Sequence, residues 1–127
     1  MDVPGTLAGT WYRDDVPAGA VGRNVWSRAL VFAPDVRRPA AKRVSIGEGF
    51  SITGLYGVHD GAAAFATVTV GGGAVGYRLD AMDNSADPWR GVLLARLVVA
   101  DSLEVEFFPG ATDLDQAFTS ARTRYVR

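Results

Sequence analysis

Leu7-Ala8-Gly9-Thr10-Trp11-Tyr12 and Arg122-Thr123-Arg124-Tyr125-Val126-Arg127 are the two stretches of sequence that decide the fold. The first places a Gly-x-Trp on the opening apolar segment, and the second places arginines on the last one. An indole can fill one end of a closed antiparallel barrel while a guanidinium from the neighbouring strand stacks on it. The two stretches therefore predict a barrel in which the first and last strands are neighbours.

Short alternating segments separated by glycine-rich turns occupy the sequence between these stretches, and no segment has a helical pattern. The clearest is Ser102–Phe108, in which Leu103, Val105 and Phe107 oppose Glu104 and Glu106. The predicted strands are Leu7–Arg13, Val25–Ala33, Lys42–Ile46, Phe50–Tyr56, Ala63–Val70, Gly76–Met82, Gly91–Val99, Ser102–Phe108 and Ala117–Val126. We expect an all-β fold, a single closed antiparallel β-barrel of about eight strands with a central apolar lumen, formed by residues 1–127 as one domain.

Composition narrows the classes of function. The 127 residues carry a net charge of -1, which argues against a nucleic-acid partner, and no apolar run reaches transmembrane length. The sequence has no cysteine, which removes disulfides and thiolate chemistry. No signal peptide is visible at Met1-Asp2-Val3-Pro4-Gly5, so we expect a cytoplasmic protein without a membrane partner.

The opening Gly9-Thr10-Trp11 resembles the first strand of the calycin superfamily, the lipocalins and avidins, and Arg122 and Arg124 are candidates for the arginine that this family packs on its tryptophan. The resemblance implies a small barrel that encloses one small ligand. Where avidins place the asparagine and serine that bind biotin, this sequence has Arg13 and Pro17, so biotin is not the expected ligand.

A second resemblance, to allene oxide cyclase and dirigent barrels, rests on Val21-Gly22-Arg23, on the segment Ile46–Gly54 and on the glycine-rich Gly71–Ala81. Those barrels include bacterial cyclases that close polyketide rings. This resemblance implies catalysis by orientation of a flexible substrate, which requires no cofactor.

Few residues offer acid–base or metal chemistry. His59 lies in a predicted hairpin turn, where an exposed histidine beside Asp60 is the simplest interpretation, and a general acid or base at the barrel mouth is the alternative. Asp14 follows the first strand, where a solvated strand end is the simplest interpretation and a second proton carrier is the alternative. One histidine and scattered acids form no metal cluster, so we expect no metal site.

Aromatic and apolar side chains are the candidate ligand contacts. They are Trp26, Phe32, Phe65, Leu79 and Trp89, with Trp89 as a lid because it ends an acidic loop. Tyr77 or Tyr56 would donate a hydrogen bond to a substrate carbonyl. The same aromatics can equally serve only to fill the core.

The residues therefore predict a barrel that binds a small apolar molecule in its lumen, and we favour cyclisation or isomerisation of that molecule, as in natural-product tailoring. The alternative is a non-catalytic, lipocalin-like carrier, and a protein-interaction module without a ligand stays open as a third. Both faces of Val25–Ala33 are apolar, so a homo-oligomer that buries the outer face is a further alternative.

Overall fold

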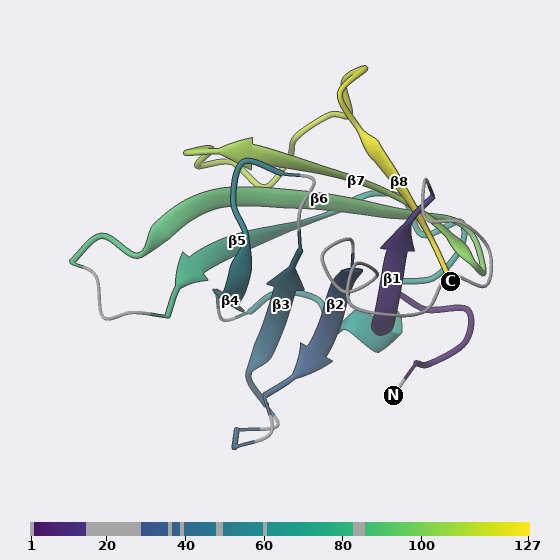
Figure 1. The fold of residues 1–127 in the computed structure, drawn as a ribbon, viewed down its shortest axis with the longest axis horizontal. Coiled ribbons are helices and arrows are strands. Elements are labelled where there is room, and N and C mark those ends of the chain that lie inside the picture. Colours follow the sequence, from purple (N-terminus) through teal and green to yellow (C-terminus); the bar gives the residue numbers. More distant parts are fainter. Residues whose placement is uncertain are drawn as a thin grey trace.

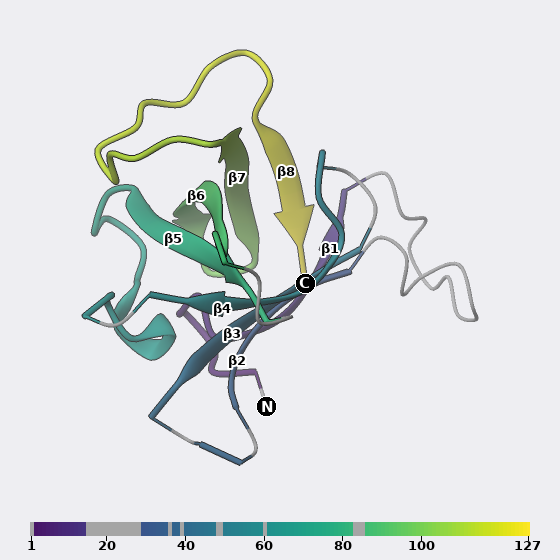
Figure 2. The same ribbon diagram turned by 90° about the vertical axis from the view of Figure 1, so that its left-hand side faces the viewer.

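The computed structural model describes residues 2–14, 29–35, 37–38, 40–47, 50–59, 61–82 and 86–127. Each strand pairs antiparallel with the next along the chain, and the last strand returns to pair with the first, which closes a barrel (Figures 1 and 2). The expected all-β, closed antiparallel barrel is confirmed. Its eight strands are β1 (Gly9–Arg13), β2 (Ala29–Pro34), β3 (Lys42–Ile46), β4 (Gly54–Val58), β5 (Val75–Ala81), β6 (Trp89–Val99), β7 (Ser102–Pro109) and β8 (Thr123–Val126).

The interior of the barrel follows the two-residue period of its strands. On β5, Tyr77 and Leu79 are fully buried while Arg78 and Asp80 alternate with them on the outer face. The inward positions of the other strands are filled with large side chains that form one packed cluster with them, including Trp11, Phe32, Val44, Leu93, Leu97, Leu103, Val105 and Tyr125. The apolar lumen that the sequence predicted is therefore occupied by the protein's own side chains.

One end of the barrel is sealed by a tryptophan and an arginine. The Trp11 side chain is 0% exposed, and its Nε1 donates a hydrogen bond to the Leu7 carbonyl at 2.9 Å. The Arg127 guanidinium lies over the indole, with its central carbon 4.1 Å from the ring centroid. The predicted pairing of tryptophan and arginine is present, but Arg127 supplies it. We call this the sealed end.

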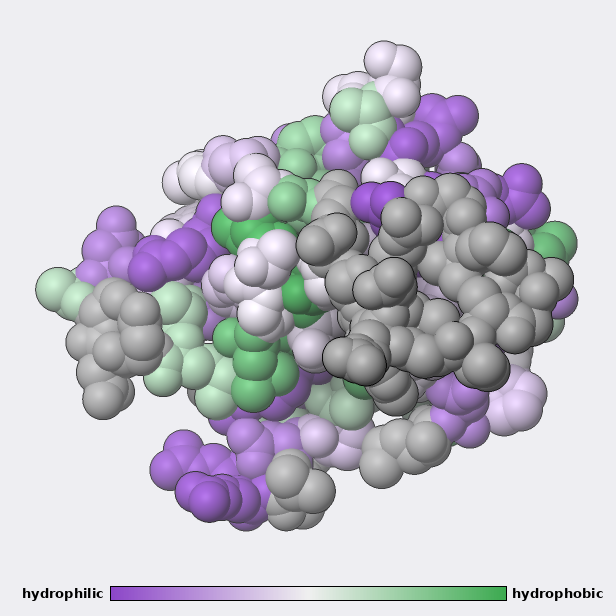
Figure 3. Space-filling model, viewed as in Figure 1, coloured by the Kyte–Doolittle hydropathy of each residue, from purple (hydrophilic) through white to green (hydrophobic). Residues whose placement is uncertain are grey.

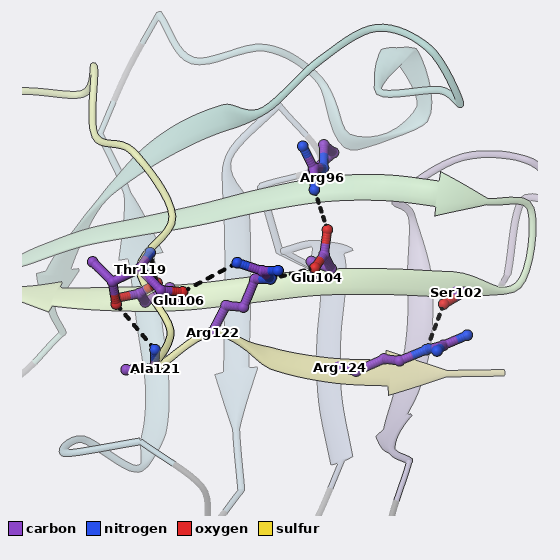
Figure 4. A network of polar contacts seen from close by, with 8 residues as sticks. All are labelled: Arg96, Ser102, Glu104, Glu106, Thr119, Ala121, Arg122 and Arg124. Atoms are coloured by element: carbon purple, nitrogen blue, oxygen red, sulfur yellow. Dashed lines mark hydrogen bonds and ion pairs between the residues drawn. The ribbon is translucent and has the colours of Figure 1, made fainter.

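Arg122 and Arg124, the two candidates for that arginine, were the wrong choice. Arg124 is paired in register with Glu104 on the outer face, and its Nε donates to the Ser102 hydroxyl at 2.9 Å. Arg122 forms an ion pair with Glu104, with 2.6 Å between its Nε and Oε2 (Figure 4). The buried Tyr125 side chain points inward from β8. Side chains two residues apart on an extended chain share a face, so Arg127 follows on the same side as Tyr125.

The segment predicted as a strand over Ala63–Val70 is also a correction. It contains a single 3-10 turn, η1 (Phe65–Thr67), followed by an isolated bridge between Thr6 and Thr69. Phe65 and Val68 are the buried residues of this segment, a three-residue spacing that a strand does not give. The fourth strand lies later than predicted, at Gly54–Val58 instead of Phe50–Tyr56, and the last one is shorter, at Thr123–Val126.

The loop between β7 and β8, residues 110–122, is fixed to the outer wall. Glu106 accepts hydrogen bonds from the Thr119 amide at 2.8 Å and the Thr119 hydroxyl at 2.6 Å, and Glu104 pairs with both Arg96 and Arg122 (Figure 4). The predicted outer-face position of the two glutamates is confirmed. Figure 2 shows this yellow-green loop passing beyond β5 before it returns as β8. In the described part of the chain, no helix has the length and apolarity that a membrane span needs.

Candidate functional site

The predicted ligand-binding aromatics Phe32 and Phe65 meet Tyr77 inside the sealed end. Phe65 packs edge-on against both of the other rings, with centroids 5.3 Å apart in each pair. The Tyr77 hydroxyl donates to the Ala63 carbonyl at 3.0 Å, and burial raises the pKa of this phenol far above its ordinary value. Leu79, also predicted to bind ligand, is fully buried on the same face of β5. These contacts hold η1 against the barrel, and a ligand role for the four residues stays a prediction.

A pocket of about 470 Å³ opens at the sealed end, between the start of the chain, the β2–β3 connection and η1. We call it the end pocket. Its lining is almost wholly apolar, with Lys42 as the charged member, and consists of Val3, Ala8, Pro34, Ala40, Lys42, Ala64, Phe65 and Ala66.

The local sequence explains why space remains there. Because Phe65 turns inward to reach Phe32 and Tyr77, only the small side chains of Ala64 and Ala66 flank it on the surface. Ala40 on the opposite wall is equally small. The predicted ligand contact Phe65 thus lines a pocket, but at one end of the barrel and not in its lumen.

A second group of side chains gathers on the outer wall, and we call Arg78, Asp80, His59 and Trp89 the outer-wall cluster. The Arg78 Nε lies 3.1 Å from the Asp80 Oδ1, and the His59 Nδ1 lies 3.6 Å from the other carboxylate oxygen. The Arg78 guanidinium carbon lies 4.0 Å from the centroid of the Trp89 ring. Trp89 in turn donates from Nε1 to the Ala111 carbonyl at 2.9 Å, which fixes the indole to loop 110–122.

Strand pairing brings this cluster together. The His59 amide continues the β4–β5 ladder by donating to the Arg78 carbonyl at 3.1 Å, and Trp89 is paired with Asp80 beside a β-bulge. A pocket of about 260 Å³ lies next to it, lined by His59, Gly61, Ala62, Arg78, Trp89, Thr112 and Leu114. Sequence reasoning singled out His59 and Trp89 but missed Arg78 and Asp80 as their partners. Their shared outer face was visible in the alternation of Gly76–Met82, whereas the register that adds His59 and Trp89 was not.

The remaining candidates lie at the other end of the barrel. Tyr56 is half-buried, and its hydroxyl donates to the Thr53 carbonyl at 2.7 Å beside an open pocket of about 360 Å³. Asp14 follows β1, and its amide donates to the Arg124 carbonyl at 3.1 Å. Trp26 lies outside the described residues. Tyr56 is paired with Ala81, the residue after Asp80, but it packs against the core, whereas the outer-wall cluster lies on the outer face. Tyr77 and His59 likewise lie on opposite faces of the barrel wall.

An apolar hollow marks the outer face of β2, β3 and β4. Figure 3 shows hydrophobic surface over the middle of this side of the molecule, between more polar flanks. The hollow measures about 180 Å³, and its apolar lining residues are Val31, Ala33, Pro34 and Leu55. The apolar outer face that the sequence analysis noted for the second strand is present in Val31 and Ala33, while the homo-oligomer that would cover it stays a prediction.

Among the residues that the structure describes, no three histidine, cysteine or carboxylate side chains group as metal ligands would. Comparisons of the chain with protein-family models, with curated proteins and with solved structures found no match.

Proposed function

We propose that this barrel binds a small apolar molecule in the end pocket, as a binding protein without chemistry of its own. The observation that carries the proposal is the pocket's lining, in which seven apolar or small residues surround about 470 Å³ and Lys42 contributes the positive charge. Ligand pockets in proteins commonly measure about 300–1,000 Å³ and are mostly apolar. Mouths of β-barrels are among the places where they occur.

Support for a rigid pocket comes from the contacts behind it. Phe65 is held between Phe32 and Tyr77, and the Tyr77 hydroxyl fixes the Ala63 carbonyl directly before η1. On the opposite wall, the Arg127 guanidinium donates to the Ala8 carbonyl at 2.9 Å and the Thr6 carbonyl at 2.7 Å. A preformed apolar pocket of this kind loses little entropy when it binds a ligand.

The positions of the predicted catalytic residues favour binding over cyclisation. Tyr77 already uses its hydroxyl within the protein, and its raised pKa makes it a weak proton donor. His59 lies on the outer wall and Asp14 at the opposite end of the barrel, so neither accompanies Phe65 in the end pocket. Cyclisation or isomerisation in this barrel stays a prediction, to be tested once a ligand is known.

The first experiment is native mass spectrometry of the gently purified protein, followed by extraction and identification of any bound molecule.

In parallel, the uncharged dye Nile red is titrated and then displaced with 1-octanol, with fluorescence as the readout. Ala66→Trp should fill the pocket and weaken dye binding by about tenfold or more. Ala121→Trp, on the exposed loop 110–122 away from the pocket, is the matched control and should bind as the wild type does. Equal affinity of the two variants contradicts the proposal.

A further inference from the structure

The outer-wall cluster holds an arginine whose geometry is fixed but whose hydrogen-bonding capacity is only partly used. Its Nε is paired with Asp80, and its guanidinium carbon lies over the Trp89 ring, 4.0 Å from the ring centroid. Within the described residues, neither of the two terminal Nη groups of Arg78 takes part in a hydrogen bond. A guanidinium that is held at Nε by a carboxylate and lies over an indole has its two Nη groups left as donors for a further partner.

The neighbours of this fork complete a small binding surface. The His59 side chain is 55% exposed and contributes an imidazole beside Asp80. Ala62, Leu114 and the indole of Trp89 provide apolar contact in the same pocket of about 260 Å³, and Thr112 adds a hydroxyl. Arg78 lies on β5, and the other contributing side chains come from the segments that flank this strand.

We propose that this pocket binds a small carboxylate with a flat apolar body, such as an aromatic acid. The carboxylate would accept two parallel hydrogen bonds from the Arg78 Nη groups, the geometry that guanidinium and carboxylate prefer. The ring would lie against Trp89 and Leu114. This site is separate from the end pocket, because Arg78 projects from the outer face of the wall whose inner face carries Tyr77 and Leu79.

The negative charge of Asp80 should affect how tightly the pocket binds a carboxylate. Asp80 orients Arg78 through Nε, and its negative charge also opposes an incoming anion at short range. Asp80→Asn keeps an oxygen to accept from Nε and removes that charge. It should therefore bind the carboxylate about threefold or more tightly, whereas a residue that only maintained the local structure would weaken binding when changed.

The test uses benzoate and its uncharged analogue benzamide with the whole protein. The readout is the indole N–H resonance of Trp89 in a two-dimensional NMR spectrum, assigned with Trp89→Phe, because this group donates to Ala111 at the pocket edge. Benzoate should shift the resonance and saturate by about 10 mM, and benzamide should bind at least about tenfold more weakly.

Arg78→Gln should lose about tenfold or more in benzoate affinity. Arg96→Gln is the matched control, because Arg96 also projects from the outer wall but pairs with Glu104 instead, and it should leave binding unchanged. Leu114→Asp adds a negative charge through an exposed side chain without altering Arg78, so it should also weaken binding even where Arg78→Gln is poorly folded. Equal binding of benzoate and benzamide, or undiminished binding by both Arg78→Gln and Leu114→Asp, would overturn the proposal.

Discussion

Two arginine–tryptophan pairs occur among the residues that the structure describes, and the distances within them are nearly the same. The guanidinium carbon lies 4.1 Å from the ring centroid in Arg127–Trp11 and 4.0 Å in Arg78–Trp89. Their surroundings differ. Trp11 is fully buried, and its partner donates to carbonyl oxygens of residues 3, 6, 8 and 100. Arg78 lies on the outer wall and, within the described ranges, pairs with the carboxylate of Asp80.

The difference shows that the stack itself does not define the role of the pair. Backbone carbonyls occupy the donors of Arg127, so this arginine joins segments of the chain that are distant in sequence. The donors of Arg78 face a pocket, so this arginine can serve a ligand. Burial and the nature of the acceptors decide whether the same stacked pair stabilises the fold or presents a site.

The largest expected effect comes from removing each tryptophan. Trp11→Ala should lower the free energy of unfolding by about 3–5 kcal/mol, because it leaves a large cavity beneath the sealed end. Trp89→Ala removes a half-buried ring and should cost about 1 kcal/mol. Urea denaturation followed by far-ultraviolet circular dichroism measures both, because this signal comes from the backbone and not from the replaced ring. Similar losses in the two variants would contradict the assignment of different roles.

Replacing Arg127 should lower the free energy of unfolding more than replacing Arg78 does, although the two variants should differ less than the two tryptophan variants. Arg127→Gln removes charged hydrogen bonds to four backbone carbonyls, two of them partly buried, and should cost about 2 kcal/mol. Arg78→Gln breaks one partly exposed ion pair and should cost less than about 1 kcal/mol. The same denaturation experiment provides the comparison. A greater loss in Arg78→Gln would mean that the outer-wall cluster is part of the stabilising framework and not a site.

The ion pairs of Glu104 with Arg96 and Arg122 should make the smallest of these contributions to stability, and that contribution should depend on pH. Hydrogen bonds from Arg96, and then from Arg122, hold the pKa of Glu104 below its ordinary value of 4.5. The ionised form therefore stabilises the native state above that value, and this contribution is lost as the pH falls through the lower native pKa.

Glu104→Gln should accordingly be less stable than the wild type at neutral pH, by less than about 1 kcal/mol because the pair is partly exposed. The difference should shrink as the pH falls below about 4.5. Thermal unfolding at a series of pH values is the measurement. A stability difference that stays constant down to the most acidic pH would show that Glu104 acts through packing instead of charge.

The sequence predicted the strands wherever buried and exposed residues alternate without interruption. Ser102–Phe108 matches β7 closely because Leu103, Val105 and Phe107 have no competing apolar face. Ala63–Val70 was wrong because its β-branched residues favour a strand by propensity, while the chain there must bring Phe65 and Val68 into the same core. In this segment, the burial of Phe65 and Val68 outweighs the local propensity for a strand.

Less of the candidate site than of the fold could be predicted from the sequence. The outward positions of Arg78 and Asp80 follow from the period of β5, but their contact with His59 and Trp89 depends on the pairing register and on the bulge after Leu79. The end pocket depends on segments far apart in the chain, from Val3 to Ala66, which no local pattern relates. For Arg127, the period that places Tyr125 inside could have identified it in place of Arg124.

The hydrogen bond from Arg127 to the Ala8 carbonyl spans 119 positions of sequence, and the β1–β8 pairing beside it spans nearly as many. During synthesis, β1 therefore emerges long before its second partner exists, and one of its edges stays without a neighbouring strand. Closure of the barrel is then a late, long-range step that depends on β8, and such non-local pairing folds slowly. An unpaired strand edge can recruit another chain in that interval. The cell's rate of translation, and not only the stability of the finished barrel, would influence how much of this protein reaches its native state.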